Sequence, residues 1–478
     1  MLLHFNTLHI LTLGYVRSVL ESNLPLQVLA SDTSQANLDK IESQAIHFIT
    51  GGMRSAPTAA CHIDADIMPL SLRRDKAVLE MTERYHRKEE NNPNHKLVTE
   101  WKANNRIKQK SILKVESNLQ NKYDLPTTRE KELTYSSIPP PNRNIEKATI
   151  NLDINSTDSK RDIDPITLKI TGLHVIQSFP DEWTHIYTDG SASNGTTNAG
   201  FGVRIEYPDK TCIKISKPCG ALCSNFDAEA IAIQSALQET KSTFLSTSKP
   251  CSNIVIFTDA RSVLQALENK NNCHPIIEKL NNSISDIITT FSVEITLQWI
   301  PSHCEIPGNE AADLLAKEGA KLEQPHTAVS LNTCKQIIKE KMKSEWLKNW
   351  ADSTTGRSVY LHLKEPNPKD PINTLGRREQ VIIYRLRTQH VQLNAHLNRI
   401  KADHPSRCPL CFNPQETVCH FLFECQHLKD LRELYLPPEP DLGSTLYSSR
   451  EQLESTTTYF ILANRRRANA HMTAGSVK

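Results

Sequence analysis

One stretch late in the chain decides the fold of its central part: Trp299-Ile300-Pro301-Ser302-His303-Cys304-Glu305-Ile306-Pro307-Gly308-Asn309-Glu310-Ala311-Ala312-Asp313. A short apolar strand pattern, Val293–Trp299, enters this stretch, and a helical pattern, Asn309–Ala320, leaves it. The loop between them contains a histidine, and the first turns of the helix carry an aspartate. Strand, loop and helix in this order are typical of an α/β domain.

The residues upstream repeat this alternation of strands and helices. The patterns predict strands at His185–Thr188, Ala199–Tyr207, Lys210–Ser216 and Asn253–Phe257, and helices at Ala228–Leu237 and Ile276–Ile288. The Pro208-Asp209 turn indicates one antiparallel hairpin, and the mixed order of elements favours a partly parallel sheet. We therefore predict an α/β domain over residues 182–321, with a mixed five-stranded sheet and flanking helices.

The rest of the chain divides into regions that differ in composition and residue pattern. The full chain of 478 residues is long enough for two or three domains. We predict mainly helical N- and C-terminal regions at 1–84 and 330–400, a compact Cys/His segment at 401–435, and a tail at 436–478 with a basic helix at Arg465-Arg466-Arg467. Residues 85–180 are polar and include Pro139-Pro140-Pro141, which predicts a partly disordered linker.

Composition narrows the class of protein. A formal net charge of +2 means that any basic surface is local. No apolar run reaches the ~18 residues of a membrane span, and the apolar start Met1–Val16 lacks a positive n-region, so we expect neither a span nor a signal peptide. The 12 cysteines then favour reduced thiols and a metal site over disulfides, as in an intracellular protein, and the sequence leaves the compartment open between nucleus and cytoplasm.

Four carboxylates occupy conspicuous positions in the predicted α/β domain. Asp189 ends the first strand, Asp259 ends the fourth, Glu229 lies in the first turns of a helix, and Asp313 lies one turn into the last helix. Such acids can converge at one edge of the sheet, where like charges raise one another's pKa. Two Mg²⁺ ions, or Mn²⁺ in their place, would resolve this repulsion. Two ions about 3.5–4 Å apart serve phosphodiester hydrolysis.

Each acid alone has a simpler explanation. Asp189-Gly190 would be a hairpin turn, Glu229 a favourable charge in a helix first turn, Asp259 an N-cap, and Asp313 part of a solvated helix face. The ordered set of four favours a shared site over four separate structural roles.

Residues 184–320 resemble the type 1 ribonuclease H domain of retroelements and cells. The matching stretches are Tyr187-Thr188-Asp189-Gly190-Ser191, Ala228-Glu229-Ala230, Phe257-Thr258-Asp259 and the run from Trp299 to Asp313. The resemblance implies a magnesium-dependent nuclease that cuts the RNA strand of RNA–DNA hybrids, with Asp189, Glu229, Asp259 and Asp313 as its metal-binding acids. It also implies that His303 assists proton transfer or product release, a task that suits histidine because its unperturbed pKa lies near neutrality.

Hybrid selectivity, which the family implies, requires contacts to the 2′-hydroxyls of one strand. Our candidates for these contacts are Ser191, Asn194, Asn225 and Gln234. The loop departs from the family at Glu305, where relatives commonly have glycine, and Ala260 replaces the usual serine after Asp259. Since all four acids are retained, we predict activity.

The segment 408–425 carries a second cluster of potential metal ligands. Cys408 and Cys411 form a Cys-x-x-Cys pair, and His420 and Cys425 follow at zinc spacing. Cys419 is the spare thiol, because it and its neighbour His420 cannot easily serve one tetrahedral site. Four protein ligands would make a closed, structural zinc site; the alternative is a set of free thiols in a helical core.

This segment resembles the C-terminal zinc-finger-like part of non-LTR, Jockey-like retrotransposon polyproteins. The preceding stretches 385–390 and 393–397 share the resemblance, and residues 38–87 look like the end of a reverse transcriptase. Nearby arginines suggest a nucleic-acid or dimer contact, or simply a solvated face: Arg377, Arg378, Arg385, Arg387 and Arg399.

Two rival interpretations are open, an enzyme of related fold and, from another functional class, a protein that only binds nucleic acid. An integrase or transposase of related fold would present Glu on the last helix, where this sequence has Asp313. A degenerate retroelement fragment would keep the fold and bind nucleic acid without catalysis. No Asp-Asp pair occurs in the sequence, so we expect no reverse transcriptase activity.

Overall fold

The computed structural model describes residues 5–102, 106, 109–132, 148–154, 164–246, 252–269 and 274–475. They form two compact units, each assembled from segments that are distant in sequence. The first comprises Met1–Leu79, Asn105–Leu119 and Lys339–Lys478, and the second comprises Glu80–Asn104 and Gln120–Ile338. Helices α6 (Leu70–His86), α8 (Ile112–Tyr123) and α14 (Leu331–Asp352) contribute residues to both.

The second unit is built on a six-stranded sheet with the order β1-β6-β5-β2-β3-β4. Its strands are β1 (Ala148–Asn151), β2 (Thr184–Ser193), β3 (Thr197–Glu206), β4 (Cys212–Leu222), β5 (Ile254–Thr258) and β6 (Ile295–Trp299). Strands β2, β3 and β4 pair antiparallel in sequence order, whereas β1, β6, β5 and β2 pair in parallel. The predicted mixed α/β architecture is confirmed.

The prediction of five strands is corrected by β1, which adds a sixth at the edge of the sheet. This strand comes from the predicted polar linker and pairs in parallel with β6, where the Asn151 amide donates to Gln298 Oε1 at 2.9 Å. The same segment also contains α7 (Pro93–Thr99), the whole of α8, and α9 (Pro165–Gln177). The disorder predicted around Pro139-Pro140-Pro141 lies outside the described residues.

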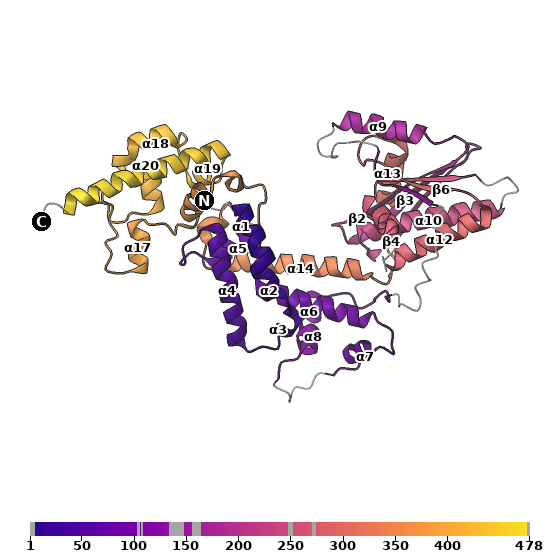
Figure 1. Ribbon diagram of the computed structural model, residues 1–478, viewed down its shortest axis with the longest axis horizontal. Coiled ribbons are helices and arrows are strands. Elements are labelled where there is room, and N and C mark those ends of the chain that lie inside the picture. Colours follow the sequence, from indigo (N-terminus) through magenta and orange to yellow (C-terminus); the bar gives the residue numbers. More distant parts are fainter. Residues whose placement is uncertain are drawn as a thin grey trace. The chain divides into compact units, whose positions relative to one another are not determined.

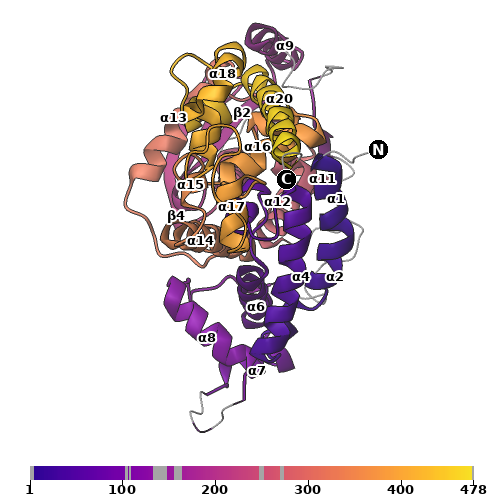
Figure 2. The same ribbon diagram turned by 90° about the vertical axis from the view of Figure 1, so that its left-hand side faces the viewer.

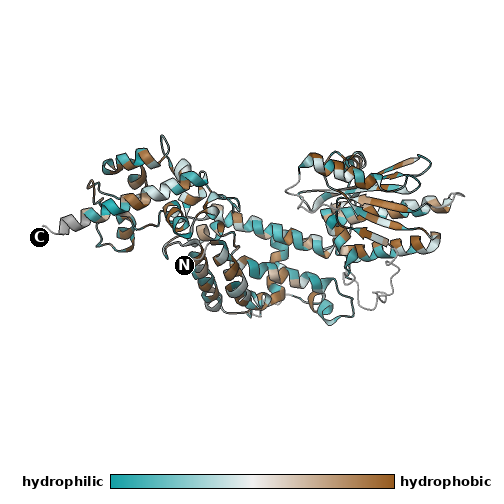
Figure 3. Cartoon of the chain, turned by 45° about the horizontal axis from the view of Figure 1, so that its top comes forward, coloured by the Kyte–Doolittle hydropathy of each residue, from teal (hydrophilic) through white to brown (hydrophobic). Residues whose placement is uncertain are grey.

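Helices cover both faces of the sheet (Figure 1). Helices α10 (Asn225–Ser246), α11 (Arg261–Glu268) and α12 (Pro275–Phe291) lie on one face, and α9 and α13 (Pro307–Lys321) lie on the other. Neighbouring side chains of β2 point to opposite faces, so Ile186 and Tyr187 enter different cores. Every residue of the central strands β5 and β6 is buried, as expected for strands covered on both sides, and Figure 3 shows brown stretches within the sheet.

Helix α13 lies unusually close to β3 because glycines face it. A Cβ atom on Gly202 would lie 2.1 Å from the backbone oxygen of Ala312, and one on Gly200 would lie 2.0 Å from the nitrogen of Ala320. Both distances are far below van der Waals contact. The two glycines therefore set the position of the helix that carries Asp313.

The first unit is helical, as predicted for the N- and C-terminal regions. Its elements are α1 (Phe5–Leu11), η1 (Thr12–Arg17), α2 (Ser18–Glu21), α3 (Leu24–Gln27), α4 (Asp32–Thr50), α5 (Thr58–Asp64), α15 (Arg357–Tyr360), η3 (Pro371–Thr374), α16 (Arg377–Thr388), α17 (Asn394–Ile400), η4 (His420–Glu424), η5 (Gln426–Leu428), α18 (Lys429–Tyr435), α19 (Leu442–Leu446) and α20 (Arg450–Gly475). Helices α18 and α20 lie side by side (Figure 2).

One core joins the two ends of the chain in this unit. Ile46 of α4, Tyr384 of α16 and Phe421 of η4 belong to the same cluster of buried apolar residues.

Within the described ranges, no helix is both long enough and apolar enough to cross a membrane.

Candidate active site and Cys/His cluster

Two of the predicted acids meet because they sit at the ends of paired parallel strands. Asp189 lies on β2 and Asp259 immediately follows β5, with Thr188 opposite Thr258 in the register. The indole Nε1 of Trp299 donates to the backbone oxygen of Asp259 at 3.2 Å and helps to fix the turn after β5. Adjacent parallel strand ends thus bring the two carboxylates to one edge of the sheet.

Glu229 reaches the same place from α10, which crosses β2 at Gly190. A Cβ on Gly190 would lie 2.3 Å from the backbone nitrogen of Glu229, so only glycine permits this approach. One carboxylate oxygen from each of Asp189, Glu229 and Asp259 lies within 4.8 Å of the other two. The structure therefore brings three of the four predicted acids into one cluster.

Burial and mutual repulsion favour the protonated forms of these acids. Burial, followed by the charges of Asp259 and Asp313, raises the pKa of Asp189 to about 8. Burial, followed by the charge of Asp189, raises the pKa of Glu229 well above its ordinary value. A cation in the cluster would reverse both effects, because it favours the ionised carboxylates.

The donor set fits a divalent cation. Asp189 Oδ2 and Glu229 Oε2 are buried and have no hydrogen-bond partner among the residues that the structure describes. Leaving such atoms unpaired is costly, and a cation that binds carboxylate oxygen would satisfy them. Mg²⁺ has this preference.

Asp313, the fourth predicted acid, lies near this cluster but outside the group of three. One of its carboxylate oxygens accepts a hydrogen bond from Lys317 Nζ at 2.6 Å, one turn further along α13. Its charge nevertheless contributes to the raised pKa of both Asp189 and Glu229. Lys317 therefore competes for Asp313 with any cation in the cluster.

His303 and Glu305 lie on the exposed loop between β6 and α13. Both have left-handed backbones, each with φ of 55°, a conformation that glycine adopts most readily. The Glu305 side chain forms an ion pair of 2.7 Å with Lys169 of α9, which lowers the pKa of Glu305. The departure from glycine at position 305 thus costs backbone strain, but its added charge has a partner.

The four predicted substrate contacts lie in different environments. Ser191 is half-buried on β2, and Asn194 is exposed in the turn after it. Asn225 is exposed, and its side-chain oxygen accepts a hydrogen bond from the Ala192 backbone N–H at 2.8 Å. The amide of Gln234 instead donates to Ser283 of α12 at 2.8 Å. This interhelical contact argues against Gln234 as a substrate contact.

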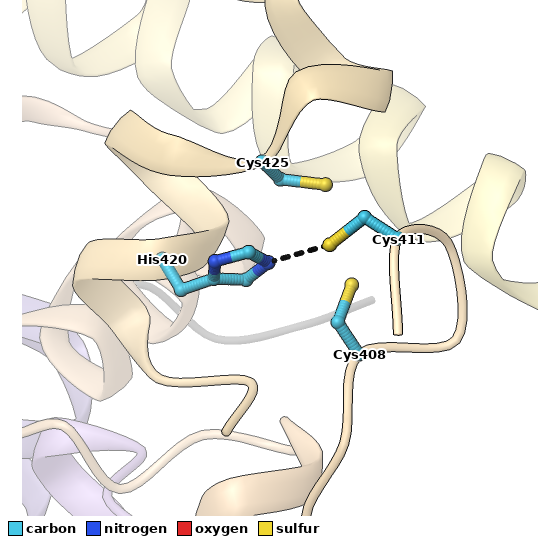
Figure 4. A group of neighbouring side chains, drawn as sticks. All are labelled: Cys408, Cys411, His420 and Cys425. Atoms are coloured by element: carbon cyan, nitrogen blue, oxygen red, sulfur yellow. Dashed lines mark hydrogen bonds between the residues drawn. The ribbon is translucent and has the colours of Figure 1, made fainter. Parts of the chain in front are cut away.

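The four predicted zinc ligands point toward one another in the first unit (Figure 4). Their ligand atoms lie within 4.8 Å of one another, and Cys411 Sγ is 3.3 Å from His420 Nε2. Zinc bonds of about 2.0–2.3 Å in a tetrahedron require ligand atoms roughly 3.3–3.8 Å apart, so a small contraction would complete the site. Cys419 remains outside the group.

The surroundings of the Cys/His cluster also suit a cation. Burial, followed by the neighbouring Cys408 thiol, raises the pKa of Cys425 to about 12, whereas a bound metal would take the thiolate form. On the far side of the imidazole, His420 Nδ1 lies 3.5 Å from a carboxylate oxygen of Glu424. A carboxylate in this position orients a metal-binding histidine.

Sequence reasoning missed Lys317 and Lys169. The first follows Asp313 at the i,i+4 spacing of helical ion pairs, a signal that was available in the sequence. The second lies 136 residues from Glu305 along the chain, and no local pattern links the two.

Two segments of the chain match known protein families. Residues 181–321 match the RNase H family, and residues 357–431 match a family described as zinc-binding in reverse transcriptase. The chain therefore contains a ribonuclease H domain that includes all four predicted acids, and a zinc-finger family segment that includes the Cys/His cluster.

Individual relatives cover the first of these segments. Ribonuclease H of Stutzerimonas stutzeri (strain A1501) is 28% identical over 150 residues, which cover 29% of this chain and 92% of that protein. Among solved structures, RNase H1 of the halophilic archaeon Halobacterium salinarum NRC-1 is 20% identical over 28% of this chain and 96% of that chain, with a TM-score of 0.24. LC11-RNase H1 in complex with an RNA/DNA hybrid is 20% identical over 29% and 96%, with a TM-score of 0.25.

Proposed function

We propose that this chain is an endoribonuclease that hydrolyses the RNA strand of RNA–DNA hybrids with two Mg²⁺ ions. The observation that carries the proposal is the convergence of Asp189, Glu229 and Asp259, with oxygens within 4.8 Å, inside a ribonuclease H domain. The relatives of this domain are named as ribonucleases H, and one was solved with an RNA/DNA hybrid.

Each acid has a distinct task in this proposal. Asp189, Glu229 and Asp259 would hold the cations, and Asp313 would join them on release from Lys317. Two ions held there, Mg²⁺ or Mn²⁺, would activate the attacking water and stabilise the leaving oxygen of the phosphodiester. His303, exposed on its loop, would carry protons between the site and solvent.

Asn225 is the best supported of the proposed contacts to the RNA strand. Because its side-chain oxygen already accepts from Ala192, the orientation of its amide is fixed. The exposed amide nitrogen is then available to donate to a 2′-hydroxyl, the group that distinguishes RNA from DNA. Ser191 and Asn194 lie next to it on β2 and its turn.

The Cys/His cluster supports a second part of the proposal, a structural zinc site. Cys408, Cys411, His420 and Cys425 would fill all four positions of a tetrahedral ion and leave none open for catalysis. A ribonuclease H domain followed by this zinc-binding segment supports an origin in the polyprotein of a non-LTR, Jockey-like retrotransposon.

A cleavage assay on the full chain tests the nuclease. The protein is incubated with Mg²⁺ and end-labelled RNA in three forms: paired with DNA, paired with RNA, and single-stranded. We expect cleavage of the hybrid alone, abolished by Asp189→Asn. Glu294→Gln is the matched control, because Glu294 is an exposed acid that precedes β6 and lies outside the carboxylate cluster.

Two results would count against the proposal. Hybrid cleavage that persists in Asp189→Asn would point to a contaminating nuclease. A folded protein that leaves the hybrid intact with both Mg²⁺ and Mn²⁺ would indicate an inactive fragment that only binds nucleic acid, with the strained Glu305 loop as the first suspect.

A further inference from the structure

A groove of about 1410 Å³ in the first unit carries a concentration of positive charge. Helices α4, α16 and α20 line it, together with the turn after α4. Six of its lining residues are lysine or arginine, and none is acidic: Lys40, Arg54, Arg377, Arg378, Arg385 and Arg465. The net charge of the whole chain is only +2, so these six residues are a local accumulation of positive charge.

Two of these cations have a structural task. Arg377 donates to the backbone oxygens of Phe48 and Ile49, at 2.6 and 2.5 Å, and Arg385 donates to that of Gly51 at 2.9 Å. These carbonyls end α4, where the helix dipole favours positive charge. The capping of α4 therefore explains Arg377 and Arg385 without any ligand.

The other four cations have no such explanation. Lys40, Arg54, Arg378 and Arg465 are exposed, and within the described part of the chain none forms an ion pair or a side-chain hydrogen bond. They come from three separate segments of sequence, so the fold gathers them onto one surface. Bringing like charges together is unfavourable unless an anion compensates for them.

His47 adds a further positive charge to the groove. Its Nδ1 lies 2.7 Å from the Ser43 oxygen and its Nε2 lies 3.0 Å from the Ala56 oxygen, so both ring nitrogens face acceptors and both must donate. Contact with Cys61, together with these carbonyls, raises the pKa of His47 to about 9. The ring is therefore cationic at neutral pH.

Aromatic side chains stand among these charges. Phe48 lines the groove with 66% of its surface exposed, and Phe460 lines it from α20. Exposed rings beside cations are how proteins bind single strands, because unpaired bases stack on rings while phosphates meet the charges. The bases of a duplex are already stacked on one another, so they are not available to stack on an exposed ring.

We propose that this groove binds single-stranded nucleic acid, with Lys40, Arg54, Arg378 and Arg465 on the phosphates and Phe48 under a base. The site is made of residues of the first unit, whereas the acids of the nuclease site belong to the second. The groove would hold an RNA or DNA strand that the nuclease does not cleave.

Binding of a labelled 20-nucleotide single-stranded RNA to the full chain tests this assignment, with fluorescence anisotropy as the readout. The Asp189→Asn background without added magnesium keeps the RNA intact and the zinc in place. We expect the double variant Arg378→Glu, Arg465→Glu to bind on the order of tenfold or more weakly, and its salt slope to fall by about 1.4, or 0.7 per lost contact. Phe48→Ala should weaken binding roughly fivefold.

The matched control reverses the charge of two exposed lysines that belong to the same unit and lie outside the groove: Lys348→Glu and Lys364→Glu. We expect it to bind like the parent. Thermal unfolding and zinc content verify that each variant folds, and a duplex of equal length and vesicles containing phosphatidylserine complete the comparison.

The proposal is overturned if groove and control variants lose equal affinity, or if neither does. It is also overturned if the groove variant loses duplex or vesicle binding as strongly as single-strand binding. Because no cleavage is measured, an inactive nuclease would leave this test unaffected.

Discussion

At the scale of single residues, the protonation of Asp189 makes the stability of the folded protein depend on pH. Without a metal its pKa is about 8, raised by burial and by the charges of Asp259 and Asp313, whereas an unfolded aspartate titrates near 3.9. Between these values the folded state holds a proton that the unfolded state has lost. Stability contributed by this proton is therefore present below about pH 4 and lost as the pH rises to about 8.

We expect Asp189→Asn to be more stable than the parent at pH 8 without added magnesium, by at least roughly 1.4 kcal/mol, the equivalent of one pKa unit. The asparagine side chain is neutral at every pH and removes the repulsion. Hydrogen exchange of the β5 peptide, which is buried in the second unit, reports the difference. The difference should shrink toward pH 4.5 and reverse with saturating Mg²⁺. A parent that is the more stable protein at pH 8 without magnesium would contradict the prediction.

Lys317 should restrain metal binding through its ion pair with Asp313. In Lys317→Met we expect half-maximal hybrid cleavage at a Mg²⁺ concentration lower by up to about fivefold, since an exposed ion pair is worth about 0.2–1 kcal/mol. Magnesium titration of the cleavage rate measures this. Lys321→Met, on the same helix but without an ion pair among the described residues, should leave the titration unchanged. A higher magnesium requirement in Lys317→Met would show that the lysine assists the site instead.

The sequence predicted the three acids that gather, Asp189, Glu229 and Asp259, because motif residues at strand ends and helix starts have few alternative positions. The fourth predicted acid, Asp313, lies outside this group and pairs with Lys317. The sequence could not predict which side chains pair with the residues of the site. Glu305 meets Lys169 only through the docking of α9, and Gln234 turns to Ser283 because α10 packs on α12. Both contacts depend on tertiary packing, which local patterns do not encode.

At the scale of elements, the strands of the motif were predictable and β1 was not. A strand of four residues between polar segments has too few apolar positions to show a period. Asn151 of β1 and its partner Gln298 of β6 are 147 residues apart in sequence, so their pairing depends on the tertiary fold. Helix α10 begins at Asn225, where the sequence places the start of this helix, but it continues to Ser246, nine residues beyond the predicted apolar stretch that ends at Leu237.

The close approach of β3 and α13 makes Gly202 intolerant of any side chain. We expect Gly202→Ala to destabilise the second unit by about 3 kcal/mol, because the new Cβ would meet backbone atoms of Ala312 and Ala316 at 2.1 and 2.5 Å. Urea unfolding monitored by exchange of the β5 peptide measures the loss. Gly14→Ala, where nothing lies within 4 Å of the new atom, is the control. Equal stability of the two variants would mean that α13 shifts at little cost.

At the scale of the whole molecule, two compact units divide the proposed tasks. The carboxylate cluster belongs to one unit, and the Cys/His cluster and the basic groove belong to the other. A structural zinc ion would stabilise its own unit by binding only the folded state. Its removal should therefore act on that unit and spare hybrid cleavage.

Cys425→Ser tests this division. We expect the variant to lose zinc affinity by more than about 100-fold, since even residues behind the ligands contribute about 10–100-fold. Amide hydrogen exchange in the α18 and α20 peptides should become faster. The exchange rate of the β5 peptide and the hybrid cleavage rate should stay within about twofold of the parent, which is the ordinary scatter for a change at a distant site. Cys419→Ser, which alters the thiol outside the cluster, should retain both zinc and slow exchange. If hybrid cleavage fell together with zinc in Cys425→Ser but not in Cys419→Ser, the two units would be energetically coupled and the zinc ion would serve the nuclease as well.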